Sequence, residues 1–130
     1  MDLLTQIRLT REIVDIESIS GREGQAGGAI SRILRDLGYE VALQPVSEGR
    51  FNVYGHIGQP AVVFSTHFDC VPPFFPSREE SGRLYGRGAC DAKGIAMAQL
   101  AAAEQLRASG VKDIGLLFVV GEERGSDGAR

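Results

Sequence analysis

The stretch Ala61-Val-Val-Phe-Ser-Thr-His67-Phe-Asp69-Cys-Val-Pro-Pro73 combines an apolar run with two polar side chains at its end. Its first five residues are β-prone and lie between two proline-containing turns, which predicts a short buried strand. His67 and Asp69 are two residues apart, so in an extended chain both project to the same side just beyond the strand. Ligands of open α/β sheets bind outside the carboxyl ends of the strands, which makes this pair a candidate site. Taken alone, a half-buried histidine near a solvated aspartate explains the same pattern.

The composition is typical of a soluble globular domain. The chain has 130 residues, 43% of them hydrophobic and 24% charged, and is long enough to bury one core. Because the net charge is −3 and no run of Lys or Arg occurs, we expect neither nucleic acid nor a membrane surface as a partner. No signal peptide and no apolar run of about 18 residues is visible, which predicts a cytoplasmic protein. Cys70 and Cys90 lack the Cys-x-x-Cys spacing and are expected to be partly buried free thiols.

Hydrophobic periodicity predicts alternating helices and strands. In the first half we expect helices over residues 3–17 and 26–37 and strands over residues 39–44 and 51–57. Gly38 ends the second helix, and Pro45 ends the first strand or places it at a sheet edge. In the second half we expect an exposed loop over 77–82, an edge strand at Leu84-Tyr85, an alanine-rich helix over 95–109 and a strand over 114–120. The last strand is almost continuously apolar, as in a parallel sheet buried on both faces, and the alternation predicts an α/β layered fold.

Polar side chains follow two of these strands and precede the alanine-rich helix. His67 and Asp69 come after one strand, Asp91 comes before the helix, and Glu122-Glu123 follow the last strand. We therefore expect the side chains to converge in one crevice. Each has a simpler explanation by itself, because Asp91 can cap a helix and adjacent glutamates can be solvated. It is less plausible that separate explanations of this kind apply to all of these residues at once.

A phosphate-binding loop is an alternative for the segment Gly88-Ala-Cys-Asp91-Ala-Lys93-Gly94. Such loops hold phosphate on backbone N–H groups at the start of a helix. The residue order disagrees, because Lys93 precedes Gly94, no hydroxyl residue follows, and Asp91 would place a negative charge beside the anion. Nucleotide binding is therefore not favoured.

Three motifs together resemble a known enzyme family. They are Ser-Thr-His67-Phe-Asp69-Cys-Val-Pro, Gly86-Arg-Gly-Ala-Cys-Asp91-Ala-Lys-Gly94 and Gly121-Glu122-Glu123. They look like the first three signature motifs of the zinc-dependent aminoacylase and acetylornithine deacetylase family of metallopeptidases. That family also includes succinyl-diaminopimelate desuccinylase, di- and tripeptidases, and glutamate-releasing carboxypeptidases. The resemblance implies a three-layer α/β sandwich with a mostly parallel sheet flanked by helices, here incomplete.

The resemblance also implies a role for each residue of the motifs. His67 would bind one Zn2+ ion, Glu123 a second, and Asp91 would bridge them, with Co2+ as an alternative metal. Glu122 would be the general base, and Asp69 would fix the tautomer of His67 from behind. The peptide bond between Asp91 and Ala92 would be cis. The implied reaction is hydrolysis of the amide bond of an N-acyl amino acid or small peptide by a metal-activated water.

The chain departs from the family in its length. Family members are two to three times longer, with further metal ligands and a small domain that helps to bind substrate and form dimers. Neither His56 nor Asp127 is placed to supply a missing ligand. We therefore expect residues 1–130 to be the N-terminal portion of a catalytic domain, with no second domain. By itself this portion is expected to be inactive, to bind zinc weakly and to self-associate.

Two other functions are compatible with the sequence. One is a non-catalytic metal-binding or assembly module that keeps the fold with an incomplete site. The other is a small zinc site built from Cys70, Cys90 and His67. The residues that select a substrate in the family lie mostly beyond these motifs, so the acyl group or peptide is not predicted.

Overall fold

The computed structural model describes residues 1–130 as an α/β fold in which helices and strands form separate layers. The elements are, in order, α1 (Leu3–Val14), α2 (Gly24–Asp36), β1 (Glu40–Ser47), β2 (Arg50–Ile57), β3 (Val62–His67), β4 (Arg78–Glu80), β5 (Arg83–Tyr85), α3 (Lys93–Ala108), β6 (Ile114–Val119) and a short 3-10 turn, η1 (Asp127–Ala129). None of the helices combines the length and apolar character that crossing a membrane requires. The predicted order of helices and strands is confirmed, except that β4 was not expected.

The main sheet is mixed, with the strand order β1-β2-β6-β3. β1 pairs with β2 and β2 with β6 in antiparallel fashion, whereas β6 and β3 are parallel. The expectation of a mostly parallel sheet is therefore wrong for these strands. The cause is local, since the pairing of Ser47 with Arg50 leaves only two residues between β1 and β2. A connection of that length can only join antiparallel strands, whereas α3 provides the long crossover between β3 and β6.

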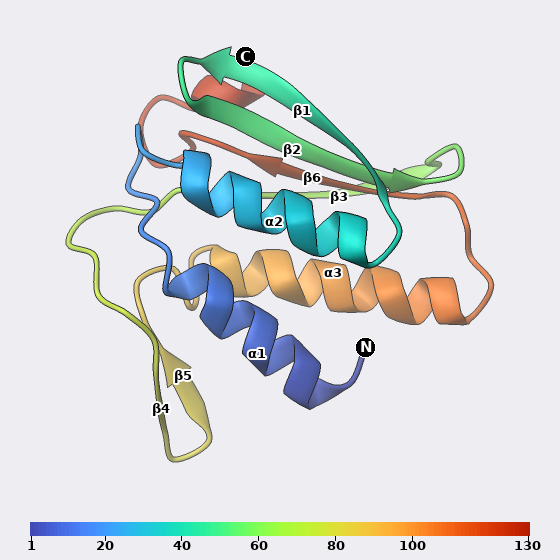
Figure 1. The fold of residues 1–130 in the computed structure, drawn as a ribbon, viewed down its shortest axis with the longest axis horizontal. Coiled ribbons are helices and arrows are strands. Elements are labelled where there is room, and N and C mark those ends of the chain that lie inside the picture. The colour runs from blue at the N-terminus through green and yellow to red at the C-terminus, as the bar shows by residue number, and fades with distance from the viewer.

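The three helices lie on one side of the sheet (Figure 1). α2 packs on β1 and β2, α3 packs on β3 and β6, and α1 packs against α3 and α2. The core between helices and sheet is apolar and includes Leu34, Val53, Met97, Leu100, Leu116 and Phe118. On the other face, Leu117 and Val119 of β6 are only half-buried. The prediction that this strand is buried on both faces is therefore wrong within residues 1–130.

Most element boundaries follow from capping and turn residues. α1 begins where the Asp2 carboxylate accepts the N–H of Thr5 at 2.7 Å, and it ends at Val14 with Asp15 as its cap, earlier than expected. Gly38 ends α2 with a φ of 85°, as expected for a left-handed terminator. β1 continues through Pro45, which is tolerated because β1 lies at the edge of the sheet.

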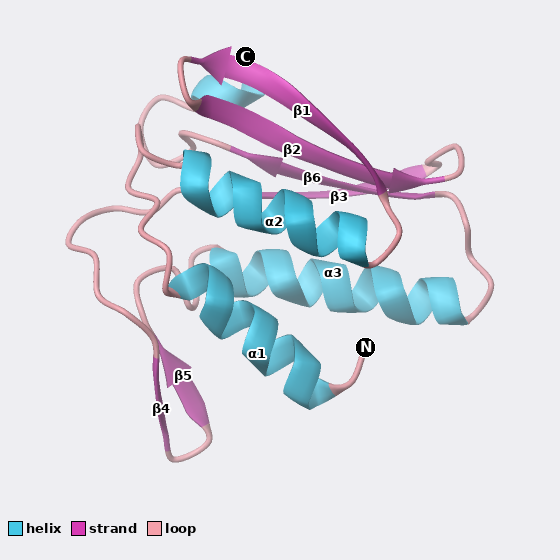
Figure 2. Ribbon diagram, viewed as in Figure 1, coloured by secondary structure: helices cyan, strands magenta, loops and turns pink.

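Two segments differ from expectation, residues 78–80 and β3. Residues 78–80 were expected in a loop but form β4, which pairs with β5 in an exposed hairpin beside α1 and away from the main sheet (Figure 2). The guanidinium of Arg78 lies 4.6 Å from the ring centre of Tyr85 and stabilises this pairing. β3 was expected to be buried, but Val62 and Val63 are 55% and 44% exposed because β3 is an edge strand.

Candidate metal centre

Three side chains converge at the carboxyl ends of the two parallel strands. His67 is the last residue of β3, Glu123 follows β6, and Asp91 lies in the turn before α3. One ligand atom of each lies within 4.8 Å of the others. An imidazole nitrogen and two carboxylates are a donor set that suits zinc. The convergence expected from the sequence is therefore present, and the donor set fits a metal ion.

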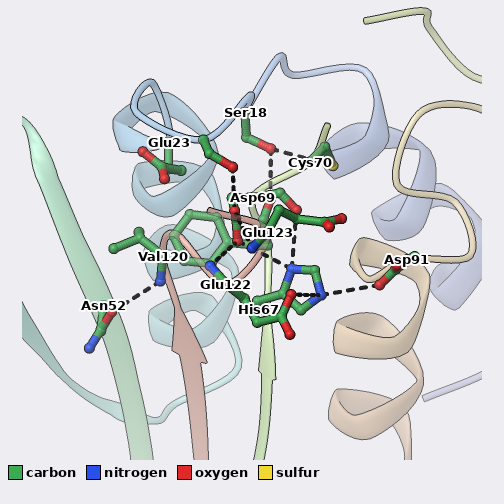
Figure 3. A network of polar contacts seen from close by, with 12 residues as sticks. Ser18, Glu23, Asn52, His67, Asp69, Cys70, Asp91, Val120, Glu122 and Glu123 are labelled. Atoms are coloured by element: carbon green, nitrogen blue, oxygen red, sulfur yellow. Dashed lines mark hydrogen bonds and ion pairs between the residues drawn. The ribbon is translucent and has the colours of Figure 1, made fainter. Parts of the chain in front are cut away.

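The two ring nitrogens of His67 face different carboxylates (Figure 3). Nε2 lies 3.1 Å from Oδ1 of Asp91 and 3.6 Å from Oε2 of Glu122, whereas Nδ1 lies 3.2 Å from Oδ1 of Asp69. His67 is 8% exposed, but the side chains of Asp91 and Glu122 are 68% and 53% exposed. One nitrogen is thus held from the interior, and the other is turned toward carboxylates that solvent can reach.

The electrostatics of the cluster reflect its crowded acidic groups. The hydrogen bond that His67 donates to Asp69, together with the charges of Asp69 and Glu122, raises the pKa of His67 to about 9. Burial, and then the charge of Asp91, raises the pKa of Glu123. These shifts are those of the metal-free protein, and a bound cation would favour neutral imidazole and ionised carboxylates.

Asp69 is a fully buried carboxylate that joins three segments of the chain. Its Oδ1 accepts the N–H of Glu122 at 3.0 Å, and its Oδ2 accepts the N–H of Glu123 at 3.1 Å and the hydroxyl of Ser20 at 2.6 Å. Burial by itself favours the neutral acid, but the bonds from His67, Ser20 and the two N–H groups outweigh it and lower the pKa of Asp69. Asp69 therefore fixes both the imidazole and the backbone of the glutamate pair.

The turn before α3 is held by a buried lysine, a contact that the sequence did not indicate. Lys93 is fully buried, and its Nζ donates to the carbonyl of Ile16 at 2.5 Å. Burial lowers the pKa of Lys93. Gly88 has a φ of 88°, and a Cβ there would lie 2.7 Å from Sγ of Cys70 and 3.0 Å from Cδ of Lys93, so only glycine fits. The bond between Asp91 and Ala92 is cis, as the resemblance implied.

The remaining candidate residues lie outside the cluster. Cys70 is buried, Cys90 is exposed, and neither is among the side chains brought together with His67. The zinc site built from both cysteines is therefore not supported. His56 stacks on Tyr54, and Asp127 pairs with an arginine, so neither is a ligand here.

Sequence reasoning missed several supporting residues, namely Ser20, Arg50, Asn52 and Lys93. For Ser20 the available signal was its place in the turn-rich segment Ser18-Ile-Ser20-Gly-Arg-Glu-Gly24 before α2. For Asn52 the one available signal was a polar amide inside an otherwise apolar strand segment.

A model of a known family covers the half of the chain that contains this cluster. The model described as Peptidase family M20/M25/M40 matches residues 63–130. This chain belongs to that family. Among curated M20 relatives, a probable carboxypeptidase of Aspergillus clavatus and an M20 domain-containing protein of Schizosaccharomyces pombe are each 40% identical to it. These matches cover 92% and 90% of the chain but 30% and 32% of the relatives, so the chain spans about a third of their length.

Solved structures agree with the M20 assignment. An M20 family metallo-carboxypeptidase of Sulfolobus solfataricus superimposes with a TM-score of 0.80 at 26% identity, over 97% of this chain and 32% of that one. A tripeptidase of Staphylococcus aureus gives a TM-score of 0.80 at 20% identity, which supports the fold alone. The α/β catalytic-domain fold expected from the motifs is thereby confirmed, although within residues 1–130 the sheet is mixed and the helices cover one face, so the three-layer, mostly parallel arrangement is not seen in this portion.

Proposed function

We propose that this chain supplies part of the metal centre of a zinc-dependent hydrolase that cleaves the amide bond of a peptide or an N-acyl amino acid. The observation that carries the proposal is the convergence of donor atoms from His67, Asp91 and Glu123 within 4.8 Å. Membership of the M20 peptidase family supports the reaction class. A surface cluster of this composition without a metal would leave two acidic side chains repelling each other beside one imidazole.

In this proposal His67 would hold one metal ion, Glu123 would hold a second, and the carboxylate of Asp91 would be shared between them. Paired ions in such centres lie about 3.5–4 Å apart, a distance that one carboxylate can span. Bound metal would supply an acidified water and a polarised substrate carbonyl. Co2+ is expected to replace Zn2+ because it accepts the same ligand types.

Three donors shared between two ions leave each below the three protein ligands usual for catalytic zinc. We propose that residues 1–130 are the N-terminal portion of a longer catalytic domain, which the greater length of the relatives supports. Further ligands would then come from residues beyond this portion. By itself, the portion is expected to bind zinc weakly and to lack turnover.

Glu122 is the residue we propose to move the proton. Its Oε2 lies 3.6 Å from Nε2 of His67, and its side chain is half-exposed beside the cluster, so it can reach a substrate without being a ligand. It would take a proton at Oε2 and return it to the leaving amine. The backbone N–H of Glu122 donates to Asp69, which limits the range of positions that the Glu122 carboxylate can adopt.

A peptide is the substrate class that we favour. The relatives that match at 40% identity are described as a carboxypeptidase and a peptidase-domain protein, and the metallo-carboxypeptidase structure shares the fold. A deacetylase or desuccinylase activity is the alternative, because hydrolysis of a peptide and of an N-acyl amino acid uses the same amide chemistry. Parallel assays with dipeptides and N-acetyl amino acids separate the two.

Paired substitutions at the two glutamates test the proposal. Glu122→Gln should leave zinc content nearly intact and remove most activity of the longer protein, because it deletes a base and no ligand. Glu123→Gln should lower zinc content, measured by titration on residues 1–130. The reverse pattern would overturn the roles. Tight metal binding with no turnover of any amide by the longer protein would instead indicate a non-catalytic metal-binding module.

A further inference from the structure

We infer that Asn52 is a positioning residue that holds the loop carrying Glu122 and Glu123 in place. Asn52 lies in β2, is 5% exposed, and touches neither glutamate side chain directly. Its Oδ1 accepts the N–H of Val120 at 3.1 Å, as Figure 3 shows, and its Nδ2 donates to the carbonyl of Gly128 at 2.8 Å. One amide group therefore joins the two ends of residues 121–127, here called the glutamate loop.

A backbone hydrogen bond also joins the two residues that flank the glutamate loop. The N–H of Gly128 donates to the carbonyl of Val120 at 2.9 Å, and within the loop Ser126 N–H donates to the Gly121 carbonyl at 2.8 Å. A Cβ at Gly128 would overlap Oδ1 of Asn52 and the backbone of Val120. The closure therefore requires glycine at this end and leaves room for nothing larger.

The loop is held by side chains from two directions. On the sheet side, Arg50, two residues before Asn52, pairs with Asp127 at 3.0 Å, and it also binds the buried carboxylate of Glu23 through two hydrogen bonds of 2.8 Å. On the interior side, Asp69 accepts both glutamate N–H groups. Asn52 adds a side-chain bridge between the two residues that flank the loop, Val120 and Gly128, so its loss should make the loop easier to open.

An asparagine is required because the site needs one acceptor and one donor at fixed separation. Aspartate of the same shape offers two acceptors when ionised, so it would keep the bond from Val120 and oppose the carbonyl of Gly128. Leucine fills a similar volume and makes neither bond. The role of Asn52 is therefore separable from its packing.

The first experiment measures loop opening without reference to function. Amide hydrogen exchange of Glu122 and Glu123 is followed by NMR in the metal-free protein and expressed relative to Leu116, a core amide. Asn52→Asp and Gly128→Ala should each accelerate this relative exchange roughly tenfold, as expected for loss of about one buried hydrogen bond. Thr10→Val, which removes a hydroxyl that bonds to the Gln6 carbonyl in α1, is the matched control and should leave it unchanged.

Two variants at opposite ends of the contact keep the test valid if one of them fails to fold. Relative exchange that is no faster in the folded variants than in Thr10→Val would overturn the inference, because Asn52 would then only stabilise the sheet.

The second readout rests on the proposed function. Co2+ affinity, measured from its visible absorption, should fall roughly tenfold in Asn52→Asp and in Gly128→Ala because Glu123 is no longer held near His67 and Asp91. Loss of loop protection with no Co2+ binding by any form, wild type included, would support the positioning role and defeat the proposed metal function. Co2+ affinity equal to that of wild type in variants with faster exchange would overturn the inference for the metal centre.

Discussion

Oδ2 of Asp69 accepts the backbone N–H of Glu123 at 3.1 Å, so a fully buried carboxylate after β3 fixes the segment that follows β6. The two segments are far apart in sequence and meet only because β3 and β6 are adjacent parallel strands. The same carboxylate orients the imidazole of His67. Asp69 thus sets the geometry of two proposed ligands without binding metal itself.

Replacing Asp69 with asparagine should therefore weaken both the centre and the fold. The amide has the same shape, but its NH2 group would face N–H and O–H donors that now point at a carboxylate. We expect zinc affinity to fall about 10–100-fold and the free energy of unfolding to fall by about 1–3 kcal/mol. Zinc titration and urea unfolding measure these changes. Asp36→Asn, an exposed carboxylate on α2, is the control, and equal effects of both substitutions would contradict the assignment.

The convergence of the motif residues could be predicted because His67 and Glu123 follow apolar strands and Asp91 precedes the alanine-rich helix, whereas their roles came from the resemblance to a family. The sheet could not be predicted in full, since an apolar run such as residues 114–120 suits a strand with parallel or antiparallel neighbours. The hairpin turn around Gly49 decides only the antiparallel pairing of β1 with β2, whereas the neighbours of β6, β2 antiparallel and β3 parallel, follow from how the whole chain folds. Ser20 and Asn52 were not foreseen because their partners, Asp69 and Val120, are distant in sequence, and only the folded chain brings them together.

Lys93→Met is expected to stabilise the metal-free protein while impairing the metal centre. Lys93 is a buried ammonium with no carboxylate within ion-pair distance, and the carbonyl of Ile16 is its one hydrogen-bond acceptor. Replacing such a group with an apolar side chain of similar length removes the cost of desolvating a charge, so the free energy of unfolding should rise. The tie between the turn carrying Asp91 and the end of α1 is lost, so zinc affinity should fall.

Thermal unfolding and zinc titration of the same Lys93→Met sample separate these two effects. A large loss of stability would show that the bond to Ile16 outweighs the desolvation cost. Lys112→Met, at an exposed position after α3, is the control and should change neither quantity.

Tyr39 is expected to make the fold sensitive to alkaline pH. Its hydroxyl donates to Oε1 of Glu104 at 2.9 Å, and burial followed by this bond raises its pKa above the ordinary value of 10.0. Because the folded pKa lies above the unfolded one, this contribution is fully present below about pH 10 and is lost as the pH rises further. Tyr39→Phe should flatten the fall of unfolding free energy above that pH, measured by urea unfolding. Tyr85→Phe, in the exposed hairpin, should retain the full slope.

The edge of β3 is expected to cause self-association of residues 1–130. Val62 and Val63 are 55% and 44% exposed on a strand with no partner on its outer side, and no charged residue occurs from Ala61 to Thr66. An uncharged, apolar edge is a template for pairing with a second copy. Sedimentation velocity should therefore show dimers or larger species that increase with concentration.

Val63→Lys should reduce this association, because a lysine on the edge disfavours pairing of two copies. Leu4→Lys is the matched control, since Leu4 is 80% exposed but lies on α1, away from any sheet edge. Equal reduction by both variants would mean that general surface apolarity, and not the β3 edge, drives association. A wild-type chain that stays monomeric at all concentrations would contradict this prediction. It would mean that the edge of β3 is already protected, for example by Gln99 of α3, whose side chain donates a hydrogen bond to the Ser65 carbonyl.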